Sequence, residues 1–425
     1  MSACNDILNQ KMEIFMSIYN LRRNQKMYRI GQEEIDAVVR VLQYARDVDS
    51  NVLFKVNESL MESINLQEEL CEKLKCEHAI FMTSGQAALT SAIVALGIGP
   101  GDEVIVPAYT YISTAMAVTM AGAIPILADV DESLTLCAKS VEEKITQRTK
   151  AIIPVHIKGL PCNMDALTAV AKKYNLYIVE DACQADGGSY KGKRLGTIGD
   201  IGAFSFNYFK IISCGEGGAL VTNNDIFHQR ALIYHDSAAV AYFGTQLEGF
   251  ETELFCGNEY RSNELCAALL RAQLKRLDDI LVDCRKNKKY IMDAVKDMCA
   301  FVPSNDIEGD CGTVVAFQFT DEATANRFAT TEGVNGSQPV YTGKHVFKNW
   351  TSIVEKRGAV NPKFDPFKMD ANKDIEPDYS EASYAKTLDI LARSVYVNVN
   401  PDATMEELDK QIECIKNGLK NAYGK

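Results

Sequence analysis

Between residues 78 and 222 the chain alternates short apolar runs, rich in Val and Ile, with longer segments whose apolar residues recur at helical spacing. Short runs that are apolar throughout are typical of strands buried on both faces, and the intervening segments are long enough for crossover helices. We therefore predict an α/β fold with a mainly parallel, seven-stranded sheet covered by helices and a binding site at the carboxyl ends of the strands. The predicted strands are residues 79–82, 103–106, 124–127, 151–155, 176–179, 202–206 and 219–222.

Helical patterns flank this core and predict helices that dock on it. A second α/β region follows, in which the polar stretch 351–381 is predicted to be an exposed insertion. We therefore predict two domains, residues 1–282 with the N-terminal helices and the large sheet, and residues 283–425 as a smaller C-terminal α/β domain. The elements behind this prediction are apolar stripes at Ile35, Val38, Val39 and Leu42, at Leu66, Leu70 and Leu74, and at Leu265, Leu269, Ala272 and Leu277 of a helix over 264–281, together with strands at 314–319 and 394–399.

Charge and composition exclude several classes of protein. The formal net charge is −12 and no long block of Lys or Arg is present, so a nucleic acid partner is not expected. No 18-residue apolar run occurs, and residues 1–30 lack the uninterrupted apolar stretch of a signal peptide, so we expect no membrane partner and a cytoplasmic location. The 13 cysteines include no Cys-x-x-Cys pair and the five histidines are widely spread, so neither a disulfide framework nor a metal site is expected.

A turn of small and polar residues joins the first predicted strand to a helix. Ser84, Gly85 and Gln86 stand at this junction, where backbone amides and the helix dipole favour an anion such as a phosphate. The alternative is that Ser84 is a plain N-cap of the helix.

Two ionisable residues follow later strands. Asp181 comes at the end of an apolar run, where a carboxylate can keep a heteroaromatic nitrogen protonated, as pyridoxal phosphate requires. The alternative is that Asp181 caps a following helix.

Lys210 lies where the run 202–206 breaks into a turn of small residues. A lysine among apolar and glycine neighbours loses hydration, which favours the free amine needed for Schiff-base chemistry, whereas a strand-end lysine that reaches water is the alternative.

The order of these three elements carries more information than any one of them. A phosphate turn at Ser84, an acid at Asp181 and a lysine at Lys210, on successive strand ends, are what a vitamin B6 enzyme needs. We therefore predict pyridoxal 5′-phosphate as the cofactor, with Lys210 and Asp181 as catalytic residues.

The chain resembles the DegT/DnrJ/EryC1/StrS family of sugar aminotransferases, which belong to the aspartate aminotransferase superfamily (fold type I). The resemblance implies a homodimer with its two active sites at the subunit interface. It also implies transfer of an amino group from glutamate or glutamine to the ketone of a sugar, a sugar nucleotide or a cyclitol, through an internal aldimine at Lys210 and pyridoxamine phosphate. The matching segments are Thr83-Ser84-Gly85, residues 99–107, Pro154-Val155-His156, Glu180-Asp181-Ala182, Phe204-Ser205-Phe206, Lys210, Gly215-Glu216-Gly217-Gly218 and Tyr260-Arg261.

Further roles are implied by position in the family motifs. Lysine at 210 is typical of the transaminating branch, because the dehydrating branch has histidine there, and it would move a proton between Cα and the cofactor's C4′. The cofactor-binding residues implied are Ser84, Gly85, Gln86, Tyr111 (stacked on the ring), Asp181, Gln184 (near the 3-hydroxyl), Ser205 (on the phosphate), Asn207, Lys210 and Asn258, and His345 would contact the substrate.

Three positions depart from the family pattern. Asn207 and Asp186 stand where many relatives have histidine, and Glu259 stands where asparagine reaches the phosphate of the neighbouring subunit. A carboxylate beside a phosphate is repulsive, so either Asn258 takes over or Arg261 neutralises Glu259. These departures leave open a non-catalytic or regulatory paralogue. Another fold type I enzyme, such as a lyase or a free amino-acid aminotransferase, is a further alternative.

Overall fold

The computed structural model describes residues 28–48, 60–237 and 251–424, so the opening segment 1–27 that entered the signal-peptide prediction lies outside it. The predicted seven-stranded sheet is confirmed, in the order β1-β9-β8-β5-β4-β2-β3. The five strands from β8 to β3 run parallel, whereas β9 is antiparallel to both of its neighbours. The strands are β1 (His78–Met82), β2 (Glu103–Pro107), β3 (Ile124–Ala128), β4 (Thr149–Ile152), β5 (Tyr177–Asp181), β8 (Ile201–Ser205) and β9 (Gly218–Thr222).

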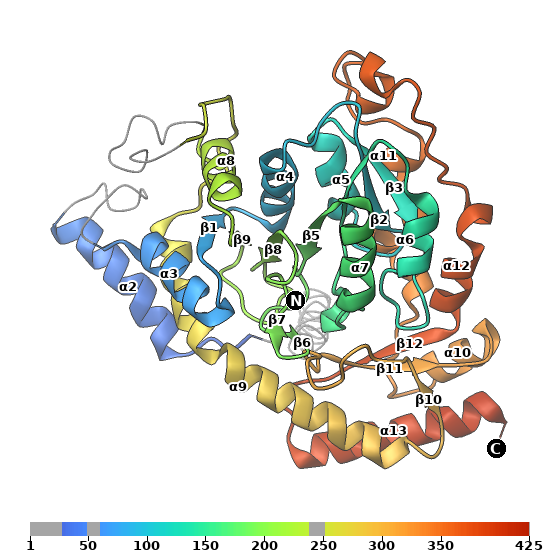
Figure 1. Ribbon diagram of the computed structural model, residues 1–425. Helices are drawn as coiled ribbons and strands as arrows, with labels where there is room; N and C mark the ends of the chain where they lie inside the picture. Colours follow the sequence, from blue (N-terminus) through green and yellow to red (C-terminus); the bar gives the residue numbers. More distant parts are fainter. Residues whose placement is uncertain (1–27, 49–59, 238–250, 425) are drawn as a thin grey trace, which may run out of the picture.

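Helices cover both faces of this sheet because its strands are apolar on both sides. Ile80 and Met82 of β1 enter one hydrophobic cluster with α4, α5 and α8, while Ala79 and Phe81 enter the other with α3, α6, α7 and α9 (Figure 1). This alternation is the period of two expected of a strand. The helices are α3 (Glu62–Leu74), α4 (Gly85–Ala95), α5 (Ser113–Met120), α6 (Ala138–Lys144), α7 (Met164–Tyr174), α8 (Asp225–His235) and α9 (Glu264–Val295).

Helix α2 (Gln32–Asp47) forms where predicted but docks through a different face. Ile35 and Val39 of the predicted stripe are 50% and 39% exposed, and Ala37 and Val41 are buried instead. The reason is electrostatic, because the buried Glu34 receives hydrogen bonds from Gln273 and Arg276 of α9 and these fix the rotation of the helix. The predicted stripe of α3 is confirmed, since its three leucines are buried.

The C-terminal region forms a smaller antiparallel sheet, β10-β11-β12, that packs with α10 and α13 against the second half of α9 (Figure 1). The predicted boundary between residues 282 and 283 falls inside α9, which contributes to both hydrophobic cores. The bounds are β10 (Ala300–Phe301), β11 (Val314–Gln318), α10 (Glu322–Ala329), β12 (Ser394–Asn398) and α13 (Met405–Tyr423), with the short hairpin β6 (Ser189–Tyr190) and β7 (Lys193–Arg194) beside α9.

Much of the stretch 351–381 is exposed, as predicted, but it belongs to a longer segment whose buried residues cover the edge of the large sheet. Trp350, at its start, is fully buried in the cluster that contains α4 and α5. At the edge strand β3, the hydroxyls of Tyr379 and Tyr384 donate to the carbonyls of Pro125 and Leu127. These bonds satisfy backbone groups that an open edge would expose. The helices here are α11 (Thr351–Val354) and α12 (Ala385–Ala392), with short 3-10 turns at Pro339–Tyr341, Gly343–His345, Phe347–Asn349, Pro366–Lys368, Asp370–Asn372 and Glu381–Tyr384.

No helix in the described ranges combines the length and apolar character needed to cross a lipid bilayer.

Candidate active site

The carboxyl ends of β5 and β8 carry the acid and the lysine singled out in the sequence. Asp181 is the last residue of β5 and pairs in register with Ala203 of the neighbouring β8. Lys210 lies in the loop that leaves β8 and returns as β9, and its backbone N–H donates to the carbonyl of Asn207. Burial raises the pKa of the Cys183 thiol well above its usual value, the charge of Asp181 raises it further, and Lys210 lowers it. The charges of Asp181 and Lys210 therefore both reach the Cys183 thiol.

Asp181 is buried, with 5% of its surface exposed, and its two oxygens have different partners. Oδ2 accepts a 2.7 Å hydrogen bond from the Thr114 hydroxyl, and Oδ1 accepts the N–H of Cys183 at 3.1 Å. The alternative that Asp181 caps a helix is wrong, because residues 182–188 form turns and no helix follows β5 directly. A buried carboxylate held from two sides is suited to stabilise a positive charge on a neighbouring group.

The start of α4 forms a tight backbone cradle next to these groups. A Cβ added to Gly85 would lie 2.7 Å from the Cys183 sulfur and 2.8 Å from Cβ of Ser205, so Gly85 and Ser205 touch. The Ser84 hydroxyl accepts the Ala87 N–H at 3.1 Å, which confirms the N-cap alternative for Ser84. The first amides of the helix, at Gly85 and Gln86, have no acceptor within the helix and point to its open end, where an anion is favoured.

Gly218 must remain glycine for this cradle to close. A Cβ there would lie 2.3 Å from the carbonyl carbon of Ser84 and 2.6 Å from the nitrogen of Gly85, and backbone atoms cannot move aside. Gly218→Ala should therefore destabilise the protein by about 1–3 kcal/mol in chemical denaturation and weaken phosphate-dependent cofactor binding. Gly343→Ala is the matched control, because its Cβ would meet no atom within 4 Å and we expect little change. If Gly218→Ala and Gly343→Ala were equally stable, the close packing of Gly218 against Ser84 and Gly85 would be contradicted.

A second group of side chains, which includes His345 and Lys158, lies within electrostatic reach of Lys210. His345 lies with its ring centroid 5.4 Å from that of Tyr111, and its carbonyl accepts the Thr110 N–H. Burial lowers the pKa of His345 to about 4, with the charges of Lys158, Lys210 and Lys344 acting in the same direction. Its imidazole is thus neutral at physiological pH. The pKa of Lys158 is also lowered, first by burial and then by Lys210.

Glu180, beside Asp181, serves the fold rather than the open site. It is fully buried, Oε1 accepts the N–H groups of Ile198 and Gly199, and Oε2 accepts that of Gly196. Its Oε2 also lies 3.1 Å from Nε2 of His156, whose Nδ1 accepts the Cys162 N–H, so Nε2 carries the proton that is donated to Glu180.

Glu180→Gln should cost about 2–4 kcal/mol of stability, because the amide NH₂ would face two donors that lose a charged acceptor. The free energy of unfolding from urea titration measures this loss. Glu143→Gln, on an exposed helix position, is the control and should change stability by less than about 0.5 kcal/mol. A Glu180→Gln variant as stable as this control would refute the assignment.

A sequence model described as the DegT/DnrJ/EryC1/StrS aminotransferase family matches residues 48–335, more than half of the chain. The chain belongs to this family. A GDP-perosamine synthase of Caulobacter vibrioides is 41% identical over 221 residues, which are 51% of this chain and 57% of that protein. The chain therefore spans less than two thirds of the length of this curated relative.

Solved structures extend the comparison over nearly the whole chain. An aminotransferase from Psychrobacter cryohalolentis superimposes with a TM-score of 0.74 and 29% identity, covering 93% of this chain and 98% of that one. DesV from S. venezuelae, solved in complex with a ketimine intermediate, superimposes with a TM-score of 0.71 and 26% identity over 92% of this chain and 95% of its own. The predicted fold type I architecture is thereby confirmed.

Pyridoxal 5′-phosphate is the cofactor of this DegT/DnrJ/EryC1/StrS member, and the residues present fit it. The glycine cradle at α4 offers backbone amides to a phosphate, and the buried Asp181 offers a carboxylate to a ring nitrogen. Lys210 is carried by the loop between β8 and β9, which begins at Ser205 and ends at Gly218, both of which touch the cradle.

The other residues predicted from the family motifs make polar contacts within the chain. Gln86 accepts from the Ser113 hydroxyl, and the Gln184 side-chain oxygen accepts the Lys158 N–H at 3.0 Å, which leaves the Gln184 amide NH₂ able to donate. Asn207 shapes the lysine turn, because its Oδ1 accepts the Phe209 N–H. Asn258 is exposed and its amide donates to the Tyr234 hydroxyl of the same chain.

Arg261 neutralises Glu259, which was one of the two outcomes expected for this departure. Two guanidinium nitrogens bind the Glu259 carboxylate at 2.6 and 2.8 Å, and the same guanidinium lies 2.7 Å from Asp236.

Sequence reasoning missed Thr114 and Lys158. Thr114 is a small polar residue in an apolar helix and gave no signal of its own. Lys158 has a left-handed backbone, with φ of 53°, stabilised by the Thr313 hydroxyl that donates to its carbonyl at 2.6 Å. Nothing in its sequence context distinguishes it from a surface lysine.

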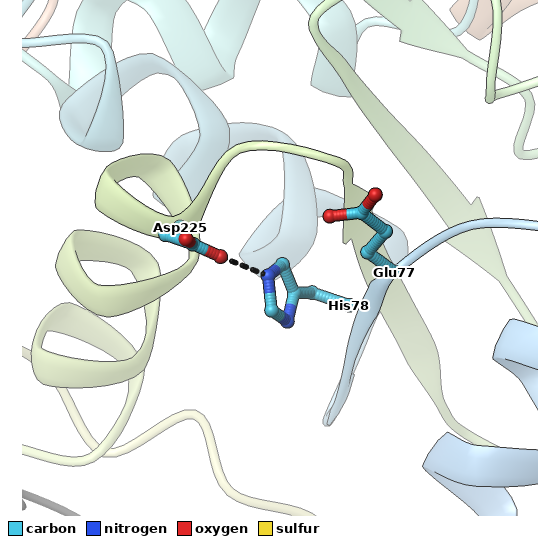
Figure 2. A group of neighbouring side chains, drawn as sticks. All are labelled: Glu77, His78 and Asp225. Carbon is cyan, nitrogen blue, oxygen red and sulfur yellow. Dashed lines mark hydrogen bonds and ion pairs between the residues drawn. The ribbon is translucent and has the colours of Figure 1, made fainter. Parts of the chain in front are cut away.

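A group of side chains that could bind a metal lies at the start of β1, whereas Ser84 and Gly85 follow its end. Figure 2 shows Glu77, His78 and Asp225, whose ligand atoms lie within 4.8 Å of one another although Asp225 is distant in sequence. Nε2 of His78 lies 2.7 Å from Asp225, whose side chain is 77% exposed. A hydrogen bond between histidine and carboxylate accounts for this arrangement.

Proposed function

We propose that this protein is a pyridoxal phosphate-dependent aminotransferase that moves the amino group of glutamate or glutamine to the keto group of a sugar nucleotide. The observation that carries the proposal is the convergence of Lys210, the buried Asp181 and the glycine cradle of α4 at one end of the sheet. Sequence similarity to a GDP-perosamine synthase supports the sugar-nucleotide acceptor.

Each residue has a distinct task in this proposal. The cofactor, when bound, supplies an electron sink for the bond changes at Cα of the donor. The amides of Gly85 and Gln86, with the Ser205 hydroxyl, bind its phosphate. Asp181 holds the proton on the ring nitrogen, and the Thr114 hydroxyl keeps that carboxylate in place. Lys210 anchors the cofactor and moves the proton between Cα and C4′.

Tyr111, Gln184 and His345 would orient the cofactor ring and the acceptor. Tyr111 is 38% exposed, which leaves part of its surface accessible, and the neighbouring His345 is neutral and can exchange hydrogen bonds with sugar hydroxyls. Asn207 and Asn258 complete the proposed set of cofactor contacts.

Isotope transfer tests this function. The purified protein, loaded with pyridoxal phosphate and given [¹⁵N]glutamate alone, should release one 2-oxoglutarate per active site; with a 4-keto sugar nucleotide added, ¹⁵N should appear in the sugar by mass spectrometry. A panel of GDP-, UDP- and dTDP-linked and free keto-sugars identifies the acceptor class. Absence of a keto-acid product from both glutamate and, in a parallel run, glutamine would favour a non-catalytic protein, and a keto-acid product without sugar labelling on any acceptor would contradict the sugar assignment.

A homodimer is part of the proposal. Tyr208 and Phe209, which directly precede Lys210, are 53% and 63% exposed, with ring centroids 3.9 Å apart. Two large aromatic rings exposed beside a buried site are typical of an interface. Asn258, on an exposed loop, would then reach the phosphate in the partner's site.

Subunit mixing tests this arrangement. If Asn258 acts on the partner's site, then mixing Lys210→Ala with Asn258→Ala protein yields hybrid dimers with one intact site. After random exchange about a quarter of wild-type activity should return, whereas each variant alone stays weak. No recovery, with exchange verified by tagged subunits, would show that Asn258 does not complete the neighbouring site.

We also propose a cytoplasmic location. Support comes from the cysteines that the structure describes, all of which are free thiols, as is typical of a reducing compartment.

A further inference from the structure

Glu77, His78 and Asp225 bring an imidazole and two carboxylates together at the start of β1. Ligand atoms from the three side chains lie within 4.8 Å of one another (Figure 2). The 2.7 Å hydrogen bond from Nε2 of His78 to Asp225 explains why these two residues approach each other, but it does not involve Glu77. One imidazole with two carboxylates is a donor set that suits a divalent transition metal ion.

The backbone that carries these three side chains is fixed by the fold. His78 is the first residue of β1 and pairs with β9, and the Glu77 N–H donates to the side-chain oxygen of Asn223 at 2.9 Å. The side chain of Asn224 caps α8, whose first residue is Asp225. Two segments about 147 positions apart therefore present potential ligands to one point. The sequence predicted no metal site, because no spacing of residues along the chain indicates this approach.

A second histidine supports the ring of His78. His228, one turn into α8, stacks on it with ring centroids 4.3 Å apart and ring planes 4° apart. Such a contact restricts the rotation of the His78 imidazole, as the outer partners of metal-binding histidines do.

The stacked rings and Glu77 border an open hollow of about 400 Å³. Glu68 and Glu72 of α3 line the same hollow, and their carboxylates add to its negative potential. Among the described residues that line it there is no lysine or arginine. The charge around the three side chains therefore favours a cation.

We propose that Glu77, His78 and Asp225 form a site for a divalent transition metal ion such as Zn²⁺, in which the ion takes the place of the proton between Nε2 of His78 and Asp225. The ring proton then lies on Nδ1, so that a neutral imidazole coordinates through Nε2. Bonds of about 2.0–2.2 Å put neighbouring ligand atoms of a tetrahedral site about 3.4 Å apart, so the group must contract by about 1 Å. Glu77 and Asp225 are exposed side chains that can turn to do so. Water takes the fourth position. The ion would join β1 to α8, and the proposal does not depend on the proposed function.

Zinc binding by the full-length, cofactor-loaded protein tests this site, after bound metals have been removed with a chelator. Isothermal titration calorimetry should show one Zn²⁺ per chain that His78→Ala and Asp225→Asn each bind about 100-fold more weakly or not at all, because each variant lacks a ligand. His228→Ala should bind it about tenfold more weakly, whereas His228→Phe, which keeps a ring stacked on His78, should stay close to wild type.

Two control variants separate this site from other ligands. Asp293→Asn removes an exposed carboxylate of α9 and should bind Zn²⁺ like wild type. Cys71→Ser tests the thiol that lines the same hollow, and it should also bind like wild type. About a thousandfold excess of Mg²⁺ should not displace the zinc, because Mg²⁺ prefers oxygen ligands to imidazole.

Several results would overturn the proposal. Wild type might bind Zn²⁺ more weakly than about 1 mM, or His78→Ala and Asp225→Asn might bind it as tightly as wild type does. Loss of binding in Cys71→Ser but not in Asp225→Asn would assign the ion to the thiol, and displacement by Mg²⁺ would contradict an imidazole ligand. Because Asp225 is exposed, Asp225→Asn should fold even if His78→Ala does not, and circular dichroism checks this.

Discussion

Lys210→Ala should lower transamination by about four orders of magnitude or more, because one change removes both the covalent anchor of the cofactor and the group that moves the proton. Initial rates of 2-oxoglutarate release under saturating glutamate measure the loss. The variant should also bind pyridoxal phosphate without the visible absorption of the lysine-bound form, since the phosphate cradle at Gly85 is intact.

Lys139→Ala is the control for this experiment, because Lys139 is 85% exposed on α6 and makes only a 3.9 Å ion pair. It should match wild type in rate and in absorption. A Lys210→Ala protein that keeps more than a few per cent of wild-type activity after dialysis would refute the catalytic assignment of this lysine.

Asp181→Asn should lower turnover by about 100- to 1,000-fold, because a neutral amide no longer stabilises the protonated ring nitrogen. Stability should change little. The amide oxygen can still accept the Cys183 N–H, and its NH₂ can donate to the Thr114 hydroxyl in place of the bond that Asp181 receives. The steady-state rate constant and the unfolding free energy, measured on the same preparation, separate the two effects.

The neighbouring Glu180→Gln variant gives the opposite pattern, which makes the pair informative. Glu180 binds three backbone N–H groups and His156, so Glu180→Gln should lower the free energy of unfolding. Asp181→Asn should instead lower turnover. Asp181→Asn with wild-type turnover would remove Asp181 from the proposed mechanism.

The strands of the large sheet were predictable because each is apolar on both faces and short. Predicted residues 79–82 lie within β1 and 219–222 within β9. The other predicted bounds differ from the observed ones by at most two residues, except that β4 ends at Ile152 and not at residue 155. The antiparallel direction of β9 was not predictable, because it depends on the short return loop through Lys210 and not on the apolar pattern. The face of α2 was mispredicted, because the ion pair of Glu34 with Arg276 outweighs the larger side chains of Ile35 and Val39.

The candidate site likewise contains residues that the sequence could predict and residues that it could not. Ser84, Asp181 and Lys210 follow strand ends, and the carboxyl ends of neighbouring strands meet, so their proximity could be predicted from order alone. His345 joins them only because residues 339–392 fold back over the edge of the sheet, which no local pattern indicates. Lys158 instead follows β4, in the short 3-10 turn Ile157–Gly159. The sequence marked Asp186 as unusual, but its lack of partners is a property of the packed structure.

The most direct measurement of the central claim is a map of the covalent bond between cofactor and protein. The loaded enzyme is reduced with borohydride, digested and analysed by mass spectrometry, and the pyridoxyl group should lie on Lys210, with glutamate added before reduction preventing the labelling. A pyridoxyl group on Lys158 or on any other lysine, or no labelled peptide at all, would contradict the account.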